Sequence, residues 1–134
     1  MTSISIPDSV TSIGQYSFDG CTGLTSIELP GVTSLANYAL RNCSNVTSIV
    51  FGPDVTSIGA GTFYGCSACL LYDFRAATSV PSLSSAGAFT TTNANKKIVV
   101  PDALYNTWIA TVQWSSSSNK VKDSIISASD YANL

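Results

Sequence analysis

Eight carboxylates and four cysteines are the residues of this sequence that could do chemistry, and no histidine accompanies them. Without an imidazole base, the usual serine and cysteine triads and most zinc sites are excluded. A glycosidase needs two carboxylates that face one pocket. Only Glu28 and Asp73 fall at matching positions of predicted parallel strands, two strands apart, which would place their carboxylates roughly 10 Å from each other. That separation is near the outer limit for an inverting pair, and no cleft is predicted around it. We therefore predict a protein that is not an enzyme and that has no cofactor or metal.

Three other carboxylates, Asp8, Asp54 and Asp102, each follow a proline. Asp favours turns at such positions because its side chain hydrogen-bonds the nearby backbone. We interpret Asp8, Asp54 and Asp102 as turn residues.

The cysteines follow a regular spacing. Cys21, Cys43 and Cys66 recur at intervals of 22 and 23 residues, which predicts one column of small buried side chains in a stacked repeat. Parallel side chains in register leave the β-carbons slightly too far apart for a disulfide, so a disulfide along the column is the less favoured alternative. Cys69 lies outside the column and forms a Cys-x-x-Cys pair with Cys66, which by itself is weak evidence for a redox or metal site.

Charge and hydropathy exclude further classes of function. The net charge of −2 leaves no basic stripe for phosphates, so nucleic acid is not a predicted partner. No apolar run approaches the roughly 20 residues that span a bilayer, so membrane insertion is not predicted. The start of the chain lacks the basic residues and apolar centre of a signal peptide. The length of 134 residues allows one folded domain.

The cysteine spacing belongs to a longer repeat. Each copy begins with a segment in which apolar and polar residues alternate, as in a strand with one buried face, and Pro or Gly then turns the chain. In the looser fourth copy, Tyr72 and Phe74 take the apolar positions of the strand. Ala77 and Val80 take the next two apolar positions, and Phe89 takes the later aromatic position. The copies lie near residues 2–23, 24–45, 46–68 and 69–95, with a final strand at 97–100.

One copy cannot bury its apolar residues alone, so the stack is the folding unit. A triplet of Thr, Ser and an aliphatic residue occurs seven times, which gives each full coil two such segments whose hydroxyl rows can hydrogen-bond along the stack. The predicted fold is a mainly β solenoid, a right-handed coil of about 4–5 stacked turns with short strands.

The repeating unit LTSIxIPxxVTSIGxxxFxGC resembles the BspA-type leucine-rich repeat. It is nearly intact at residues 2–21 and 46–66, and the middle copy substitutes Leu40 and Asn42. The resemblance implies a leucine-rich-repeat solenoid used for adhesion and binding, typically in bacterial surface proteins, with related repeats in phage-encoded structural proteins. The family shares no catalytic residues, so it supplies none for this chain.

The two ends of the predicted solenoid differ. Residues 1–101 form the solenoid and residues 102–134 a C-terminal helical cap, in which Asp102 caps a helix and Trp108 and Trp114 close the core rather than bind sugar. The helix is expected to present an apolar face made of Leu104, Tyr105, Trp108, Ile109 and Val112. At the other end, residues 2–7 are predicted to form an open edge for docking or self-association.

Outward side chains are the candidate binding residues, because the outward positions of a solenoid vary freely while the core pattern holds. One predicted row contains Tyr16 and Tyr38, and the next contains Asp19, Arg41 and Tyr64. A third row, Ser5, Glu28, Val50, Asp73 and Val99, is expected to project from the strands. The candidate site residues are Gln15, Tyr16, Glu28, Asn37, Tyr38, Tyr64 and Asp73.

The predicted function is a non-enzymatic binding or adhesion module that recognises protein or glycan at a bacterial surface, as the extracellular part of a longer protein. The alternative is a structural or assembly part of a larger protein or of a phage tail tip. In that case the chain is virion-associated and docks through its open N-terminal edge.

Overall fold

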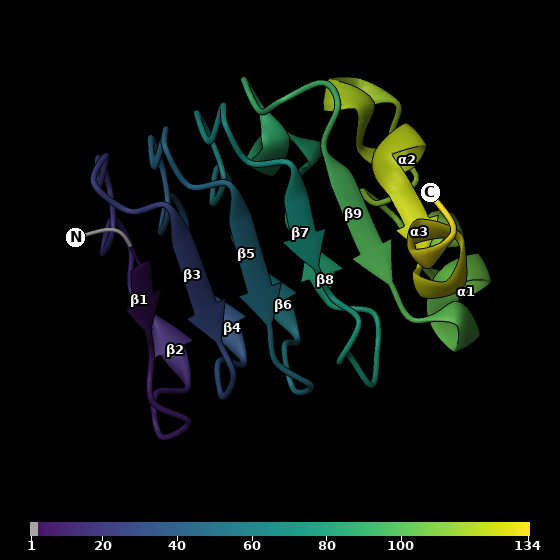
Figure 1. Ribbon diagram of the computed structural model, residues 1–134, viewed down its shortest axis with the longest axis horizontal. Coiled ribbons are helices and arrows are strands. Elements are labelled where there is room, and N and C mark those ends of the chain that lie inside the picture. Colours follow the sequence, from purple (N-terminus) through teal and green to yellow (C-terminus); the bar gives the residue numbers. More distant parts are fainter. Residues whose placement is uncertain (1–2) are drawn as a thin grey trace.

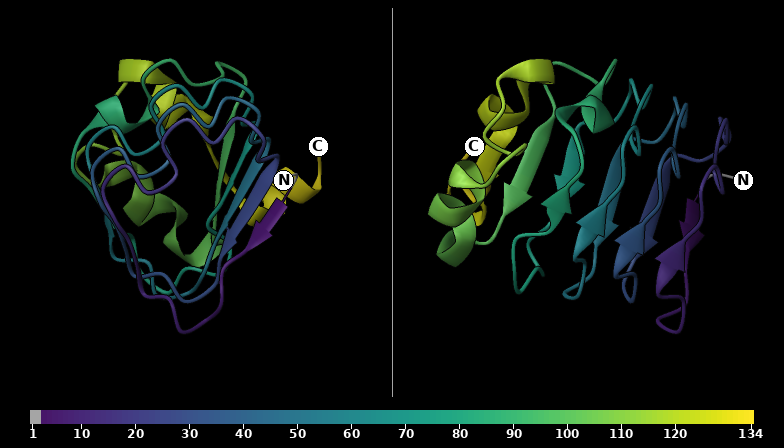
Figure 2. Two further views of the ribbon diagram at one scale, coloured as in Figure 1. Left: turned by 90° about the vertical axis from the view of Figure 1, so that its left-hand side faces the viewer. Right: turned by 180° about the vertical axis from the view of Figure 1, so that it is seen from behind.

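The computed structural model describes residues 3–134, and Met1 and Thr2, where the first repeat was expected to begin, lie outside the described residues. The described chain forms two parallel sheets whose strands alternate along the sequence up to residue 100, after which one more strand joins the larger sheet. Figure 1 shows the strands of the larger sheet side by side from the N-terminus to the C-terminus, and the left panel of Figure 2 shows successive coils nearly superimposed. The strands of the larger sheet, in order, are β1 (Ser3–Ser5), β3 (Ser26–Leu29), β5 (Ser48–Phe51), β7 (Leu71–Asp73), β9 (Lys97–Val100) and β10 (Ile125–Ser127).

The register of the larger sheet follows the repeat. Ile4 pairs with Ile27, and Ile27 pairs with Ile49. Tyr72 and Ile98 continue the same column through β7 and β9. Ile27, Ile49, Tyr72 and Ile98 are all buried, so the alternation read from the repeat places this column in the core.

The smaller sheet corrects one assignment in the fourth repeat. Leu83 pairs with Ile58, so Leu83, and not Val80, takes the inward position. The residues before Pro81 form a longer connection in which the Thr78 hydroxyl donates to the Pro53 carbonyl at 2.9 Å. The triplet at 78–80 is therefore a loop segment. The strands of the smaller sheet are β2 (Ser12–Ile13), β4 (Ser34–Leu35), β6 (Ser57–Ile58) and β8 (Ser82–Leu83).

Threonine hydroxyls tie each coil to the preceding one. Thr33 Oγ1 donates to the Thr11 carbonyl at 3.0 Å, and Thr56 Oγ1 donates to the Thr33 carbonyl at 3.1 Å. Thr47 Oγ1 makes the equivalent bond to the Thr25 carbonyl on the other sheet. The hydroxyl rows thus bond along the stack as expected, but their acceptors are main-chain carbonyls of the preceding coil.

After β9 the chain passes through short helical segments and returns to the larger sheet as β10. Strand β10 was not predicted, and it pairs in parallel with β9 so that Ile125 lies beside Ile98. No helix within residues 3–134 is long and apolar enough to cross a membrane. The helical segments of the structure are η1 (Ala86–Phe89), η2 (Asp102–Leu104), α1 (Tyr105–Ala110), η3 (Ser118–Lys120), α2 (Val121–Ser124) and α3 (Ala128–Ala132).

Two details of the segment after Pro101 differ from the prediction. The Asp102 carboxylate does not cap the following helix, because it accepts hydrogen bonds from the Ser129 amide at 2.9 Å and from the Ser129 hydroxyl. Val112 is 75% exposed, since α1 ends at Ala110, and the apolar face therefore stops before it.

Trp108 and Trp114 are fully buried, as their interpretation as core residues requires. The Trp114 ring lies 5.7 Å from that of Phe74 and 5.9 Å from that of Phe89, measured between ring centroids. Its Nε1 donates to the Pro81 carbonyl at 2.8 Å. The two indoles thus extend the aromatic core beyond the fourth repeat.

The outer face of the larger sheet is covered near its C-terminal side. The left panel of Figure 2 shows α3 outside the sheet, and α3 contacts β9 and β10. Val99, which was expected to project into solvent, is fully buried, and Asp73 is only 9% exposed. The expectation of a fully exposed strand row was therefore wrong at Val99 and Asp73.

Candidate functional site

The rings of Tyr16 and Tyr38 stack across two adjacent coils. Their centroids are 5.4 Å apart and their planes differ by 6°. Both residues have a φ of 59°, the left-handed region, which costs a residue with a side chain roughly 1–2 kcal/mol. In the third coil the corresponding residue is Gly61, which also has a positive φ of 64°. The chain thus keeps two tyrosines where its own repeat elsewhere uses glycine.

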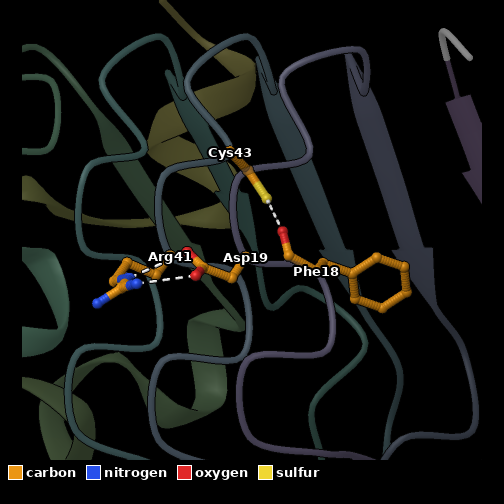
Figure 3. A network of polar contacts seen from close by, with 4 residues as sticks. All are labelled: Phe18, Asp19, Arg41 and Cys43. Carbon is orange, nitrogen blue, oxygen red and sulfur yellow. Dashed lines mark hydrogen bonds and ion pairs between the residues drawn. The ribbon is translucent and has the colours of Figure 1, made fainter.

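Arg41 joins the tyrosine pair to Asp19 of the preceding coil. Its Nε and Nη2 donate to the two carboxylate oxygens of Asp19 at 2.9 and 2.8 Å, as Figure 3 shows. The guanidinium carbon also lies 5.0 Å from the Tyr16 ring centroid and 5.7 Å from that of Tyr38. A planar guanidinium with this bidentate geometry holds its partners in one arrangement.

The ion pair sets the charge of this surface. Side-chain hydrogen bonds from Arg41 lower the pKa of Asp19, and the same bonds raise the pKa of Arg41. Both groups are therefore charged over the ordinary pH range and balance one another. In Figure 3 the ion pair lies on one side of the coil backbone, and the Phe18 ring extends on the other side toward the strands.

The aromatic side chains remain available at this surface. Tyr16 is 45% exposed and Tyr64 is 39% exposed, while Tyr38 and Arg41 are half-buried. We call Tyr16, Asp19, Tyr38, Arg41 and Tyr64 the tyrosine patch.

The flanking residues that sequence reasoning chose, Gln15 and Asn37, are both exposed beside the tyrosine patch. Asn37 also links two coils, because its Oδ1 accepts a hydrogen bond from the Ala60 amide of the next coil at 2.8 Å. Gln15 and Asn37 thus border the patch at its two tyrosine-bearing coils.

Glu28 and Asp73 lie apart from the tyrosine patch, on the larger sheet. The register places Val50 between them. Burial would raise the pKa of Asp73, but the hydrogen bonds and charge of Arg75 outweigh it and lower that pKa. The Asp73–Arg75 pair is bidentate, with an Oδ2–Nη2 distance of 2.7 Å. Asp73 is therefore held ionised and cannot serve as the protonated acid of a glycosidase pair.

The four cysteines are free thiols. Cys43 Sγ donates to the Phe18 carbonyl at 3.0 Å, and Cys66 Sγ makes the same bond to the Leu40 carbonyl at 3.2 Å. Burial raises the pKa of Cys43 to about 11 and that of Cys69 to about 12, and it raises the pKa of Cys66 further. These protonated thiols are poor nucleophiles and poor metal ligands. Within residues 3–134 no three His, Cys, Asp or Glu side chains come together as a metal site.

Sequence reasoning placed Asp19 and Arg41 in one row but missed their ion pair. The available signal was a pair of opposite charges 22 residues apart, which is one repeat length. The stacking of Tyr16 on Tyr38 carried the same signal, since those residues are also 22 apart. Residues that share a repeat position become neighbours in a solenoid, so outward pairs can be searched for in the same way as core columns.

Parallel sheets stacked repeat by repeat define a leucine-rich-repeat fold. The chain belongs to the BspA-type leucine-rich repeat family. The family described as BspA type Leucine rich repeat region matches residues 1–108 in six copies, which confirms the resemblance of the repeat unit. Such repeat families are generally non-enzymatic and typically bind proteins, and this family is typically associated with bacterial surfaces.

Solved structures of leucine-rich repeat proteins resemble this fold. One from Bacteroides ovatus is 25% identical with a TM-score of 0.57, over 76% of this chain and 30% of that protein. The T. pallidum leucine-rich repeat protein is 17% identical with a TM-score of 0.49, over 74% of this chain and 57% of that protein. The chain thus spans less than two thirds of either protein. No curated protein matches it.

Proposed function

We propose that this protein is a non-enzymatic recognition module that binds a protein partner through the tyrosine patch. The observation that carries the proposal is the stacked pair Tyr16–Tyr38, held in left-handed backbone, with the Arg41 guanidinium 5.0 Å from the Tyr16 ring centroid. Tyr and Arg are enriched among the residues that dominate binding energy at protein interfaces. Side chains that are already ordered lose less entropy when a partner binds.

A protein partner is better supported than a glycan. Sugars bind aromatic residues by lying on an exposed ring face, whereas one face of each ring in this pair is turned toward the other ring at 5.4 Å. The Tyr38 ring also lies against Gly61, so the outer face of Tyr16, the ring edges and the neighbouring guanidinium remain for contact. Such groups suit the side chains and main-chain carbonyls of a protein.

We also infer that the module acts in adhesion at a bacterial surface, as part of a longer extracellular protein. In this proposal residues 1–101 form a right-handed solenoid of about 4–5 turns, and residues 102–134 form a helical cap that closes it. The surface association that is typical of the family supports the location, and the burial of Trp108 and Trp114 supports the cap.

The test is a binding screen of the purified chain against an arrayed set of secreted and cell-surface proteins. Any protein that binds is then titrated against Tyr38→Ala, Arg41→Ala and a control, Val112→Ala, which changes a side chain that is 75% exposed outside the patch. We expect the two patch variants to bind at least about tenfold more weakly, about 1.4 kcal/mol, and the control to bind like the wild type. Equal affinities for all variants, or the absence of any binder, would overturn the proposal.

A second candidate function is an assembly part of a larger protein or of a phage tail tip that docks through its N-terminal edge. One observation favours it. An apolar hollow of about 220 Å³ opens at that end of the stack, lined by Ile4, Phe18, Cys21, Gly23 and Leu24. Side chains of this kind are usually covered in monomeric proteins.

A further inference from the structure

The stack of Tyr16 on Tyr38 brings two phenol rings face to face. Their centroids are 5.4 Å apart and their planes differ by only 6°. Among the residues that the structure describes, no other two tyrosines are in ring contact, and the buried Tyr72 packs on phenylalanine rings instead. In nearly parallel rings the π orbitals of one ring are directed at the other. The pair is therefore arranged for a bond that forms through the ring faces.

The neighbours of the pair restrict its separation. The Tyr38 ring lies against Gly61 of the next coil, so it cannot withdraw from Tyr16 in that direction. The Arg41 guanidinium lies near both rings, and the two tyrosines share the same φ of 59°. Groups that are held together in this way react with each other far faster than the same groups on separate molecules.

Phenol rings in this arrangement can be coupled by oxidation. Loss of one electron and of the hydroxyl proton turns a phenol into a phenoxyl radical, whose unpaired electron is shared by the oxygen and the two neighbouring ring carbons, Cε1 and Cε2. Two such radicals combine by forming a carbon–carbon bond between these positions. The bond forms between π orbitals, so rings that face one another are correctly oriented for it. Each bonded carbon then loses its proton while the neighbouring oxygen regains one, and both rings become aromatic again.

The coupling removes two electrons and two protons in total. Hydrogen peroxide accepts them when a haem peroxidase transfers the electrons one at a time, and it leaves as two molecules of water. The reaction therefore needs no group of this chain other than the two phenols.

The stacked phenols are accessible to an oxidant in solution. Tyr16 is 45% exposed and Tyr38 is half-buried. Both tryptophans, Trp108 and Trp114, are fully buried and are thereby shielded from an oxidant that acts by contact. Tyr64 is 39% exposed, but its ring contacts no other tyrosine of the described chain, so its radical couples between molecules.

We propose that the Tyr16–Tyr38 stack is an oxidative cross-linking site, at which a peroxidase and hydrogen peroxide join the two rings into a dityrosine. The bond would tie the first described coil covalently to the second. The modification goes beyond the proposed recognition function and needs no binding partner.

The test treats the purified chain with a haem peroxidase and hydrogen peroxide at a low and a high protein concentration. The product that retains the mass of one chain is isolated, its thiols are reduced and alkylated, and trypsin is added. Because Arg41 is the first basic residue of the sequence, both tyrosines lie in the peptide of residues 1–41. Mass spectrometry then shows whether this peptide has lost two hydrogens, and its fragmentation locates the bond.

Three variants decide which phenols react. Tyr16→Phe and Tyr38→Phe each keep a ring in the stack and remove one hydroxyl. Tyr64→Phe is the matched control, because it removes a comparably exposed phenol outside the stack.

We expect the wild type and Tyr64→Phe to form the cross-linked peptide in the same proportion at both concentrations, since the reaction is intramolecular. Tyr16→Phe and Tyr38→Phe are expected to lose it completely. Dityrosine that is found only in covalent dimers overturns the proposal, as does an equal loss of the peptide in Tyr64→Phe. A wild type that forms no cross-linked peptide while free tyrosine in the same solution is coupled overturns it as well. Partner binding is measured without oxidant, so this proposal and the proposed function fail independently.

Discussion

The ring of Tyr38 lies against the backbone of Gly61, one coil further along the stack. A β-carbon built on Gly61 would be 2.3 Å from Cε1 of Tyr38, well inside van der Waals contact. Gly61 also has a φ of +64°, which residues with side chains rarely adopt. The position of the tyrosine pair therefore depends on a glycine that is itself buried.

Replacing Gly61 by Ala is expected to move the Tyr38 ring and to destabilise the fold by about 1–3 kcal/mol. The control is Gly20→Ala. Gly20 has a φ of +72° with no atom within 4 Å of its added β-carbon, so it incurs the backbone cost alone. Urea unfolding gives the stabilities, and NMR chemical shifts of the Tyr38 ring report its position. Equal losses in the two variants with unmoved ring resonances would contradict the expected contact.

Alkaline pH is expected to destabilise the chain through its buried thiols. Cys43, Cys66 and Cys69 have raised pKa values in the fold, against an ordinary value of 9.0. Their contribution to stability is complete below pH 9 and is lost as the pH rises toward their folded pKa values, because only the unfolded chain releases these protons. Each thiol lowers the unfolding free energy by at most about 1.4 kcal/mol per pH unit.

Urea unfolding in the presence of a reductant, between pH 8 and pH 10.5, measures this slope. Cys66→Ala removes one of the three contributors and is expected to make the downward slope less steep by at most about 1.4 kcal/mol per pH unit. The control is Val46→Ala, which changes a buried side chain that binds no proton and should leave the slope unchanged. A slope that Cys66→Ala does not alter would contradict the assignment to buried thiols.

Lys96 is expected to act on stability in the opposite direction. Its side chain is buried, with Nζ donating to the Asn119 carbonyl at 2.7 Å, and burial followed by the charge of Lys120 lowers its pKa to about 8. Between pH 8 and the ordinary value of 10.5 the unfolded chain holds a proton that the folded chain has released. In that window Lys96 makes stability rise with pH, by at most about 1.4 kcal/mol per unit.

The thiols oppose this rise in the wild type, so the comparison needs the variant Lys96→Met. The wild type should gain stability relative to Lys96→Met as the pH increases from 8 to 10, because the thiols are common to both proteins. Val112→Met changes a side chain that is 75% exposed and binds no proton, so it serves as the control and should show a constant difference. A constant difference for Lys96→Met as well would contradict the lowered pKa of Lys96 in the folded chain.

The two tryptophans are expected to differ in their sensitivity to replacement by Phe. Trp114→Phe loses packing and also leaves the Pro81 carbonyl without its indole donor, at a cost of about 2–4 kcal/mol. Trp108→Phe loses packing alone, because its buried Nε1 has no hydrogen-bond partner among the described residues. Thermal unfolding compares the two variants. A larger loss for Trp108→Phe would contradict the role assigned to the Trp114 bond.

The core of the repeats was predictable from the sequence because identical spacing produces identical environments. Ile4, Ile27 and Ile49 share one column for this reason. The prediction failed where the spacing changed. Extra residues before Pro81 moved the inward position from Val80 to Leu83, and the repeat gives no signal for insertions.

The segment after Pro101 was less predictable because it has no second copy to compare. Ile125 and Ile126 form β10 only by pairing with β9, a contact between residues distant in sequence. Val99 is buried on a strand that α3 contacts, and α3 is equally distant in sequence. For the candidate site, repeat positions placed Tyr16 beside Tyr38, but the support from Gly61 needed the three-dimensional path of the ring. The binding role of these residues stays a prediction.

The threonine bonds between coils have a consequence for the history of such chains. Thr33 bonds to the Thr11 carbonyl and Thr56 to the Thr33 carbonyl, across 22 and 23 residues, so these two junctions use the same donor and the same acceptor. A duplication or loss of one whole coil creates a junction with chemistry already present in the chain. Array length can therefore change in single genetic steps without a new interface having to evolve.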